Sequence, residues 1–143
     1  MIRSYIAENR ARFMEEWASL IRIPSISCQP AHKDDMLRCA ERWRELLLEA
    51  GAQHAEVMPS KGNPFVYAEY SPMEVEGERL EVKGKNIPMV LVYSHYDVMP
   101  VEPLDLWQSN PWEPTIREGR LYARGADDDK GQAMIQVKAF EYL

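Results

Sequence analysis

The feature that most constrains the fold is the apolar run Met-Val-Leu-Val-Tyr at residues 89–93. Neighbouring side chains of a β-strand point to opposite faces of the sheet, so a strand that is apolar at every position needs cover on both faces. In α/β proteins, helices on each face supply that cover. The run therefore predicts an α/β fold: a three-layer sandwich with a mixed, mostly parallel sheet, flanked by helices, whose central strand spans residues 88–94.

Two amphipathic helices and two strands are predicted before this run. Apolar residues recur at helical spacing over residues 2–22 and again over residues 34–50. Gly51 follows the second pattern, and helices commonly end at a glycine. A short strand comes after Gly51, and residues 65–70 form a second strand, rich in β-branched and aromatic residues. The apolar stripes of both helices are interpreted as core rather than as ligand-binding faces.

The remaining segments divide into loops and short elements. Residues 71–87 mix charges with isolated apolar residues and glycines, which indicates a surface hairpin or loop; a lid or a partner-binding arm is the less favoured alternative. Residues 98–118 contain four prolines and form a loop anchored by two tryptophans. Residues 119–123 form a short strand, and a third helix begins near Lys130.

Composition excludes several classes of function. The chain has 143 residues, 45% of them hydrophobic and 28% charged, which is ordinary for one globular domain. Its formal net charge of −6 and its lack of basic runs argue against a nucleic-acid partner. No apolar stretch reaches transmembrane length, so no membrane partner is expected. Without an N-terminal signal pattern, and with Cys39 on an apolar helical face, we expect a reduced, cytoplasmic location.

His95 and Asp97 lie two residues apart, just after the apolar run. Residues at this spacing project from the same face of a strand. In open α/β sheets, binding sites form beyond the carboxyl ends of the strands. A single histidine at such a position is more often structural than a ligand, so the pair needs support from elsewhere in the sequence.

That support comes from three consecutive aspartates, Asp127-Asp128-Asp129. Adjacent carboxylates in a buried cluster need a cation or strong hydrogen-bond donors among them. A solvated turn that caps the third helix is the alternative, less favoured because of the pair upstream. A calcium loop is discounted because its acidic ligands alternate along the sequence. The residues therefore predict half of a divalent metal site.

Two motifs carry a resemblance to a known family. They are Ser-His-Tyr-Asp-Val-Met-Pro at residues 94–100 and Gly-Arg-Leu-Tyr-Ala-Arg-Gly-Ala-Asp-Asp-Asp-Lys-Gly at residues 119–131, with Trp107 and Pro111-Trp112 between them. Together they resemble the dinuclear zinc peptidase and deacylase family, which includes carnosinase-like dipeptidases, aminoacylase, acetylornithine deacetylase and succinyl-diaminopimelate desuccinylase. The resemblance is strong over residues 88–143 and rests on general pattern in the two N-terminal helices.

The resemblance implies a role for three residues. His95 would be a metal ligand, Asp97 the catalytic carboxylate that orients and tunes it, and Asp128 the carboxylate that bridges two metal ions. It also implies two zinc ions per complete site, with cobalt or manganese as possible replacements, and a cis peptide bond between Asp128 and Asp129. A carboxylate behind a ligating histidine fixes its tautomer, and a bridging carboxylate can hold two cations about 3.5–4 Å apart.

The implied function is zinc-dependent hydrolysis of the peptide bond of dipeptides or short peptides by metal-activated water. Deacylation of N-acyl amino acids is one alternative, and a non-catalytic metal-binding fragment is another. The family's catalytic glutamate and its other ligands occur farther downstream. Residues 1–143 are therefore expected to be the N-terminal, truncated portion of a catalytic domain, with little or no activity alone. Apolar surface left uncovered in such a portion predicts either self-association into a homo-oligomer or a poorly ordered edge.

Overall fold

The computed structural model describes residues 1–71, 74–75, 78–79 and 89–143. Its elements in chain order are α1 (Ile2–Ile21), a 3-10 turn (Pro30–His32), α2 (Lys33–Glu49), β1 (His54–Met58), β2 (Phe65–Glu69), β3 (Glu74–Val75), β4 (Glu78–Arg79), a 3-10 turn (Leu104–Leu106), β5 (Thr115–Arg117), β6 (Arg120–Tyr122) and α3 (Lys130–Tyr142). The two N-terminal helices, the two strands after Gly51 and the start of α3 lie where the sequence predicts them. No helix in the described part of the chain has the length and apolar content needed to cross a bilayer.

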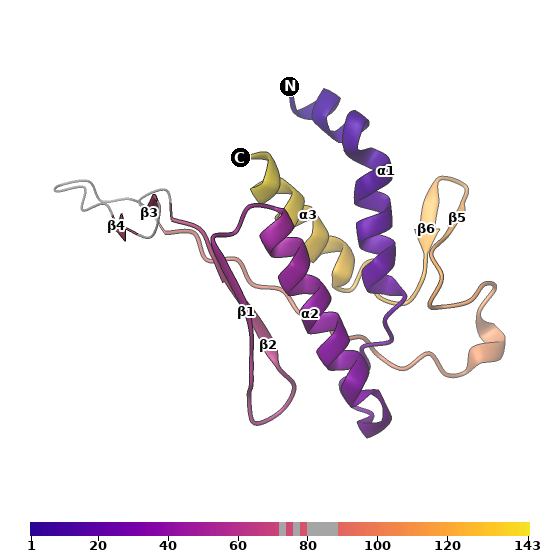
Figure 1. Ribbon diagram of the computed structural model, residues 1–143. Helices are drawn as coiled ribbons and strands as arrows, with labels where there is room; N and C mark the ends of the chain where they lie inside the picture. Colours follow the sequence, from indigo (N-terminus) through magenta and orange to yellow (C-terminus); the bar gives the residue numbers. More distant parts are fainter. Residues whose placement is uncertain (72–73, 76–77, 80–88) are drawn as a thin grey trace.

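The hydrophobic core lies where the three helices meet (Figure 1). Helix α1 packs against both α2 and α3. The apolar stripes predicted from the sequence supply the buried side chains, which are Leu20 of α1, Cys39, Trp43 and Leu46 of α2, and Ala133, Met134 and Val137 of α3. Cys39 is fully buried, which confirms its predicted role as a small apolar residue, and burial raises the pKa of its thiol.

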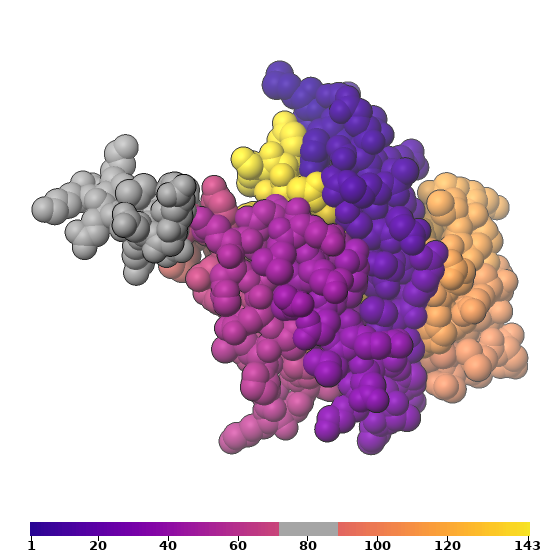
Figure 2. Space-filling view, viewed as in Figure 1, coloured from indigo at the N-terminus to yellow at the C-terminus, as the bar shows by residue number. Residues whose placement is uncertain are grey.

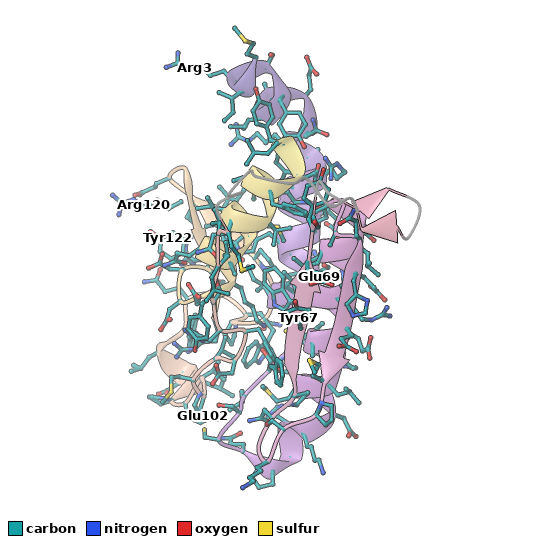
Figure 3. The ribbon with its side chains drawn as sticks, turned by 90° about the vertical axis from the view of Figure 1, so that its left-hand side faces the viewer. Arg3, Tyr67, Glu69, Glu102, Arg120 and Tyr122 are labelled. Atoms are coloured by element: carbon teal, nitrogen blue, oxygen red, sulfur yellow. The ribbon has the colours of Figure 1, made fainter. Side chains whose placement is uncertain are left out.

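Two hairpins flank the helices (Figures 1 and 3). Strands β1 and β2 pair antiparallel and pack against α2. Strands β5 and β6 also pair antiparallel and are joined by Glu118 and Gly119, whose φ angles are 50° and 75°. Two positive φ angles suit a two-residue hairpin turn, because they match the twist of the flanking strands. The sequence predicts β6 but places β5 within a loop.

The expected central strand is not formed. Residues 89–94 have no strand assignment, and Met89 and Leu91 are 95% and 91% exposed; Pro88 lies outside the described residues. All strand pairs among the described residues are antiparallel, so the mostly parallel sheet is absent from this part of the chain. A parallel partner would have to come from beyond a long crossover. Each described strand instead pairs with its neighbour in the sequence, and none of these strands pairs with residues 89–94.

The segment 71–87, predicted to be a surface hairpin or loop, is described only in part. Within it, β3 and β4 pair antiparallel, with Glu74 opposite Arg79 and Val75 opposite Glu78. The rest of the prediction for this segment falls mostly on residues outside the described ranges.

Candidate metal centre

Residues 96–98 are anchored on the loop that follows α1. The Ser25 hydroxyl donates a hydrogen bond to the carbonyl oxygen of Tyr96 over 2.7 Å. The backbone N–H of Val98 donates to the carbonyl oxygen of Ser25 over 2.9 Å. Because Ser25 is fully buried, these two bonds fix the backbone on either side of Asp97 although no sheet holds this segment.

The three residues predicted to form the site come together around one imidazole. His95 Nδ1 lies 3.0 Å from Asp97 Oδ1, and His95 Nε2 lies 3.0 Å from Asp128 Oδ1. Asp127, the first residue of the acidic run, instead lines an open cavity of about 610 Å³ with Glu102 and Trp107 among its walls. Of these two aspartates, Asp128 lies on the imidazole and Asp127 does not.

The third aspartate holds the backbone of the histidine. The N–H of His95 donates to Asp129 Oδ2 over 3.1 Å. The peptide bond between Asp128 and Asp129 is cis, as the family resemblance implies. The two neighbouring carboxylates therefore take different partners: Asp128 faces the imidazole ring, and Asp129 faces the main chain of the same residue. The sequence alone does not distinguish the role of Asp129 from that of its neighbours.

A buried lysine connects the aspartate turn to α1. Lys130 is fully buried, and its ammonium donates to the carbonyl oxygens of Leu20 and Ile23, each over 2.8 Å. Leu20 lies in the last turn of α1 and Ile23 just after it, where the helix dipole favours a cation. Burial lowers the pKa of Lys130, an effect that the nearby Cys39 and Asp97 partly offset.

Gly125 brings the aspartate turn close to the segment that carries the histidine. Its φ is +78°, a region that other residues rarely adopt. A Cβ at this position would lie 2.8 Å from Val98 Cγ1 and 3.2 Å from Lys130 Cδ. In the sequence Gly125 is only one residue of the second motif, since neither the close approach to Val98 nor the burial of Lys130 leaves a local pattern.

The electrostatic balance at His95 favours a positive charge. Burial lowers the pKa of the imidazole, but hydrogen bonds to Asp97 and Asp128 raise it, and the net result is a pKa above the usual value. The site remains open to solvent, because the side chains of His95 and Asp128 are 44% and 84% exposed.

The arrangement fits a metal ligand pair. A neutral imidazole carries one N–H, and if this proton is on Nδ1 facing Asp97, the lone pair of Nε2 faces an oxygen of Asp128. Two acceptors this close need a proton or a cation between them. Ligands at about 2.0–2.1 Å from one tetrahedral zinc lie about 3.4 Å apart, and the observed separation of Nε2 and Oδ1 is 3.0 Å. A nitrogen and a carboxylate oxygen are also the ligand types that zinc accepts.

The pair supplies two ligands. Within the described ranges, no group of three or more His, Cys, Asp or Glu side chains is arranged to hold a metal ion. Structural and catalytic zinc sites use three or four protein ligands.

Comparison with known proteins places these motifs in a family. Residues 91–143 match the description "Peptidase family M20/M25/M40". The chain is 30% identical over 138 residues to a cysteinylglycine-S-conjugate dipeptidase of Corynebacterium striatum, covering 96% of this chain and 28% of that protein. It is 49% identical over 59 residues to a succinyl-diaminopimelate desuccinylase of Azoarcus sp. (strain BH72), covering 41% of this chain and 16% of that protein.

A solved structure shares the arrangement of the elements. The M20 family metallo-carboxypeptidase Sso-CP2 from Sulfolobus solfataricus superimposes with a TM-score of 0.74 at 32% identity, covering 92% of this chain and 26% of that one. The chain thus spans less than a third of the length of each of these proteins. The family match includes both the His95 segment and the aspartate turn. The chain therefore belongs to the peptidase family M20/M25/M40.

Proposed function

We propose that this chain carries part of the active site of a metal-dependent peptidase that hydrolyses dipeptides or short peptides. The observation that carries the proposal is His95 held between two carboxylates, with Nδ1 on Asp97 and Nε2 facing Asp128. The relatives that match along most of the chain, a dipeptidase and a metallo-carboxypeptidase, support peptide substrates. Zinc is the metal that the family resemblance implies, with two ions in a complete site.

Each residue has a distinct task in this proposal. His95 Nε2 and Asp128 Oδ1 would hold the metal, with Asp128 as the bridging carboxylate. Asp97 keeps the proton on Nδ1, which directs the lone pair of Nε2 toward the metal side and makes it more basic. Asp129 holds the main chain of His95. When bound, the metal polarises the scissile carbonyl and makes water more acidic.

The fold of the whole enzyme is also a proposal. We infer that residues 1–143 form the N-terminal portion of the catalytic domain and that residues 71–87 form a surface hairpin or loop. In a chain as long as its relatives, residues 89–94 would join a mostly parallel sheet as the centre of a three-layer sandwich. The apolar character of this run on both faces supports that placement.

Deacylation of N-acyl amino acids is the second candidate. The identity of 49% over 59 residues to the desuccinylase supports this candidate. Both reactions cleave an amide, so these residues serve either one, and the choice depends on the groups that contact the substrate.

Metal binding tests the proposal directly. We expect the chain to bind Zn²⁺ or Co²⁺, as measured by calorimetry and by cobalt absorption, and His95→Ala to lower the affinity at least about 10-fold because a ligand is removed. The matched control is His54→Ala, since His54 is exposed on β1 and contacts Glu56 instead. Equal affinity for the wild type and His95→Ala would refute the site.

The substrate class needs a second measurement. The zinc- or cobalt-loaded chain is assayed with a panel of dipeptides and a panel of N-acyl amino acids. Turnover of dipeptides that is lost in His95→Ala supports the peptidase, and turnover of the acylated panel supports the deacylase. Metal binding without turnover of either panel favours the third reading, a metal-binding portion that is not catalytic by itself.

A further inference from the structure

The loop after α1 contributes a side chain to the metal centre. The Ser27 hydroxyl donates a hydrogen bond to Asp97 Oδ2 over 2.5 Å, while the other oxygen, Oδ1, lies on His95 Nδ1. Short hydrogen bonds of this kind are typical of a hydroxyl that donates to a charged carboxylate, and they are stronger than neutral ones. Ser27, Asp97, His95 and Asp128 thus form one continuous chain of polar contacts.

The backbone places Ser27 at this position. The loop runs beside the segment that carries Asp97, and Ser25 is bonded to it on both sides, through the carbonyl oxygen of Tyr96 and the N–H of Val98. Ser25 and Ile26 are buried, so the loop cannot shift easily relative to α1. The side chain two residues after Ser25 therefore meets the carboxylate that lies between those two bonds.

A carboxylate needs such a partner to keep one orientation. The Asp97 side chain is 38% exposed, so without a second partner it could rotate and exchange the contact to His95 for water. When the hydroxyl holds Oδ2, the plane of the carboxylate is fixed, and Oδ1 stays on Nδ1. The proton then stays on Nδ1, and the lone pair of Nε2 stays directed at Asp128.

We propose that Ser27 is a positioning residue of the metal centre, which acts through Asp97 to fix the tautomer and orientation of His95. The proposal rests on the function proposed above. Ser27 is not assigned as a nucleophile, because its hydroxyl donates to a carboxylate and a nucleophilic serine needs an adjacent general base of the histidine type.

The test compares three variants of the full chain. Ser27→Ala removes the hydroxyl, and Ser27→Thr keeps it. Ser60→Ala is the matched control, since it removes a hydrogen bond from a serine hydroxyl to a main-chain carbonyl in the loop between β1 and β2 and leaves the contacts of Asp97 in place. Affinity for Zn²⁺ and for Co²⁺ is measured by titration, and the free energy of unfolding is measured for each variant. We expect Ser27→Ala to weaken metal binding about 10-fold and Ser27→Thr to restore it to within about 3-fold of the wild type.

A second readout does not depend on metal. In the metal-free chain labelled with ¹⁵N-histidine, NMR reports which ring nitrogen of neutral His95 carries the proton, with His32 and His54 as internal references. Asp97 and Asp128 compete for the single ring proton, so we expect the fraction of His95 with its proton on Nδ1 to fall in Ser27→Ala relative to the wild type, to recover in Ser27→Thr, and to keep its wild-type value in Ser60→Ala.

The outcomes are distinct. An unchanged His95 tautomer in Ser27→Ala, or a loss of metal affinity in Ser27→Ala that Ser60→Ala matches, would overturn the positioning role. If the wild type binds neither metal, the proposed function fails, while the tautomer measurement still decides for or against Ser27.

Discussion

His95 is held at three points, two on its imidazole ring and one on its main chain, by its near neighbour Asp97 and by two aspartates more than thirty residues away. Asp97 takes one ring nitrogen, Asp128 faces the other, and Asp129 accepts the backbone N–H. The last two contacts depend on the turn at residues 125–130 keeping its position. At the scale of single residues, that position depends on Lys130, whose ammonium joins the turn to the end of α1.

Lys130→Met should therefore destabilise the fold as well as the site. The substitution keeps most of the side-chain volume but removes the charged donor from the carbonyl oxygens of Leu20 and Ile23, which keep only their backbone partners, the N–H groups of Ile23 and Ser25. A hydrogen bond from a charged donor contributes about 1.5–3 kcal/mol, and removal of the desolvated ammonium recovers part of that loss. We expect a loss of about 2 kcal/mol in the free energy of unfolding, measured by urea denaturation.

Lys61→Met is the control for this substitution, because Lys61 is exposed in the loop between β1 and β2. It should change the free energy of unfolding by less than about 0.5 kcal/mol. A Lys130→Met protein that is as stable as the Lys61→Met protein would show that the contacts to α1 contribute little.

The sequence predicts the site only where the signal is local. His95, Asp97 and the aspartate run are visible because alternation along a strand and a run of adjacent carboxylates are properties of neighbouring residues. Ser27 and Lys130 act through contacts with segments far away in the chain. A serine after a helix and a lysine at the start of one have no local pattern that distinguishes them from surface residues.

At the scale of elements, a group of charged side chains joins α1 to α3 beside the core. Glu141 of α3 accepts hydrogen bonds from Tyr5 over 2.6 Å, from Lys138 over 2.5 Å, and from Arg12. Lys138 also pairs with Glu16 of α1 over 2.5 Å. Burial raises the pKa of Glu141, but the hydrogen bonds from Arg12, Lys138 and Tyr5 lower it, to about 2.

This depressed pKa makes the contact between the helices sensitive to acid. The carboxyl has a pKa of 4.5 when unperturbed and about 2 in the fold, so its stabilising effect is complete above pH 4.5 and is lost as the pH falls toward 2. Linkage gives a loss of about 2 kcal/mol between pH 6 and pH 3. Between pH 6 and pH 3, the free energy of unfolding of Glu141→Gln, measured by urea denaturation, should fall by about 2 kcal/mol less than that of the wild type.

Arg12→Leu provides the second arm of this experiment. It removes the donor that lowers the pKa of Glu141 most, so the acid-sensitive range should move upward toward pH 4.5. If Glu141→Gln and the wild type lose equal stability between pH 6 and pH 3, the contact does not stabilise the fold through its charge.

At the scale of the whole molecule, the packed helices differ from one exposed apolar segment, residues 89–93. In Figure 2, α1 and α2 form one continuous face, with the β5–β6 hairpin along its edge. The helices and the β1–β2 hairpin could be predicted because each is specified by its own periodicity and by a neighbour close in sequence. Residues 89–93 were predicted to be the centre of a sheet and are exposed instead, because a central strand exists only when two further strands flank it.

An extended, apolar and exposed segment should make this chain associate with itself. Unpaired backbone groups and apolar side chains can pair with the same segment of a second copy. We expect sedimentation velocity to show association that increases with concentration in the range of tens of micromolar. Leu91→Lys should shift the chain toward the monomer, because Leu91 is 91% exposed and a buried lysine at a strand pairing is unfavourable.

The control for this effect is a second exposed leucine outside the segment. Leu106 is 75% exposed in the short 3-10 turn between residues 104 and 106, so Leu106→Lys adds the same charge elsewhere. Equal effects of the two substitutions would mean that net charge governs association, since the chain already carries a formal charge of −6. A wild-type chain that stays monomeric at every concentration would mean that residues 89–93 are covered within the same molecule. In that case Leu91→Lys should instead lower the free energy of unfolding. Sedimentation and denaturation together therefore show whether residues 89–93 are covered by a second copy or by the same molecule.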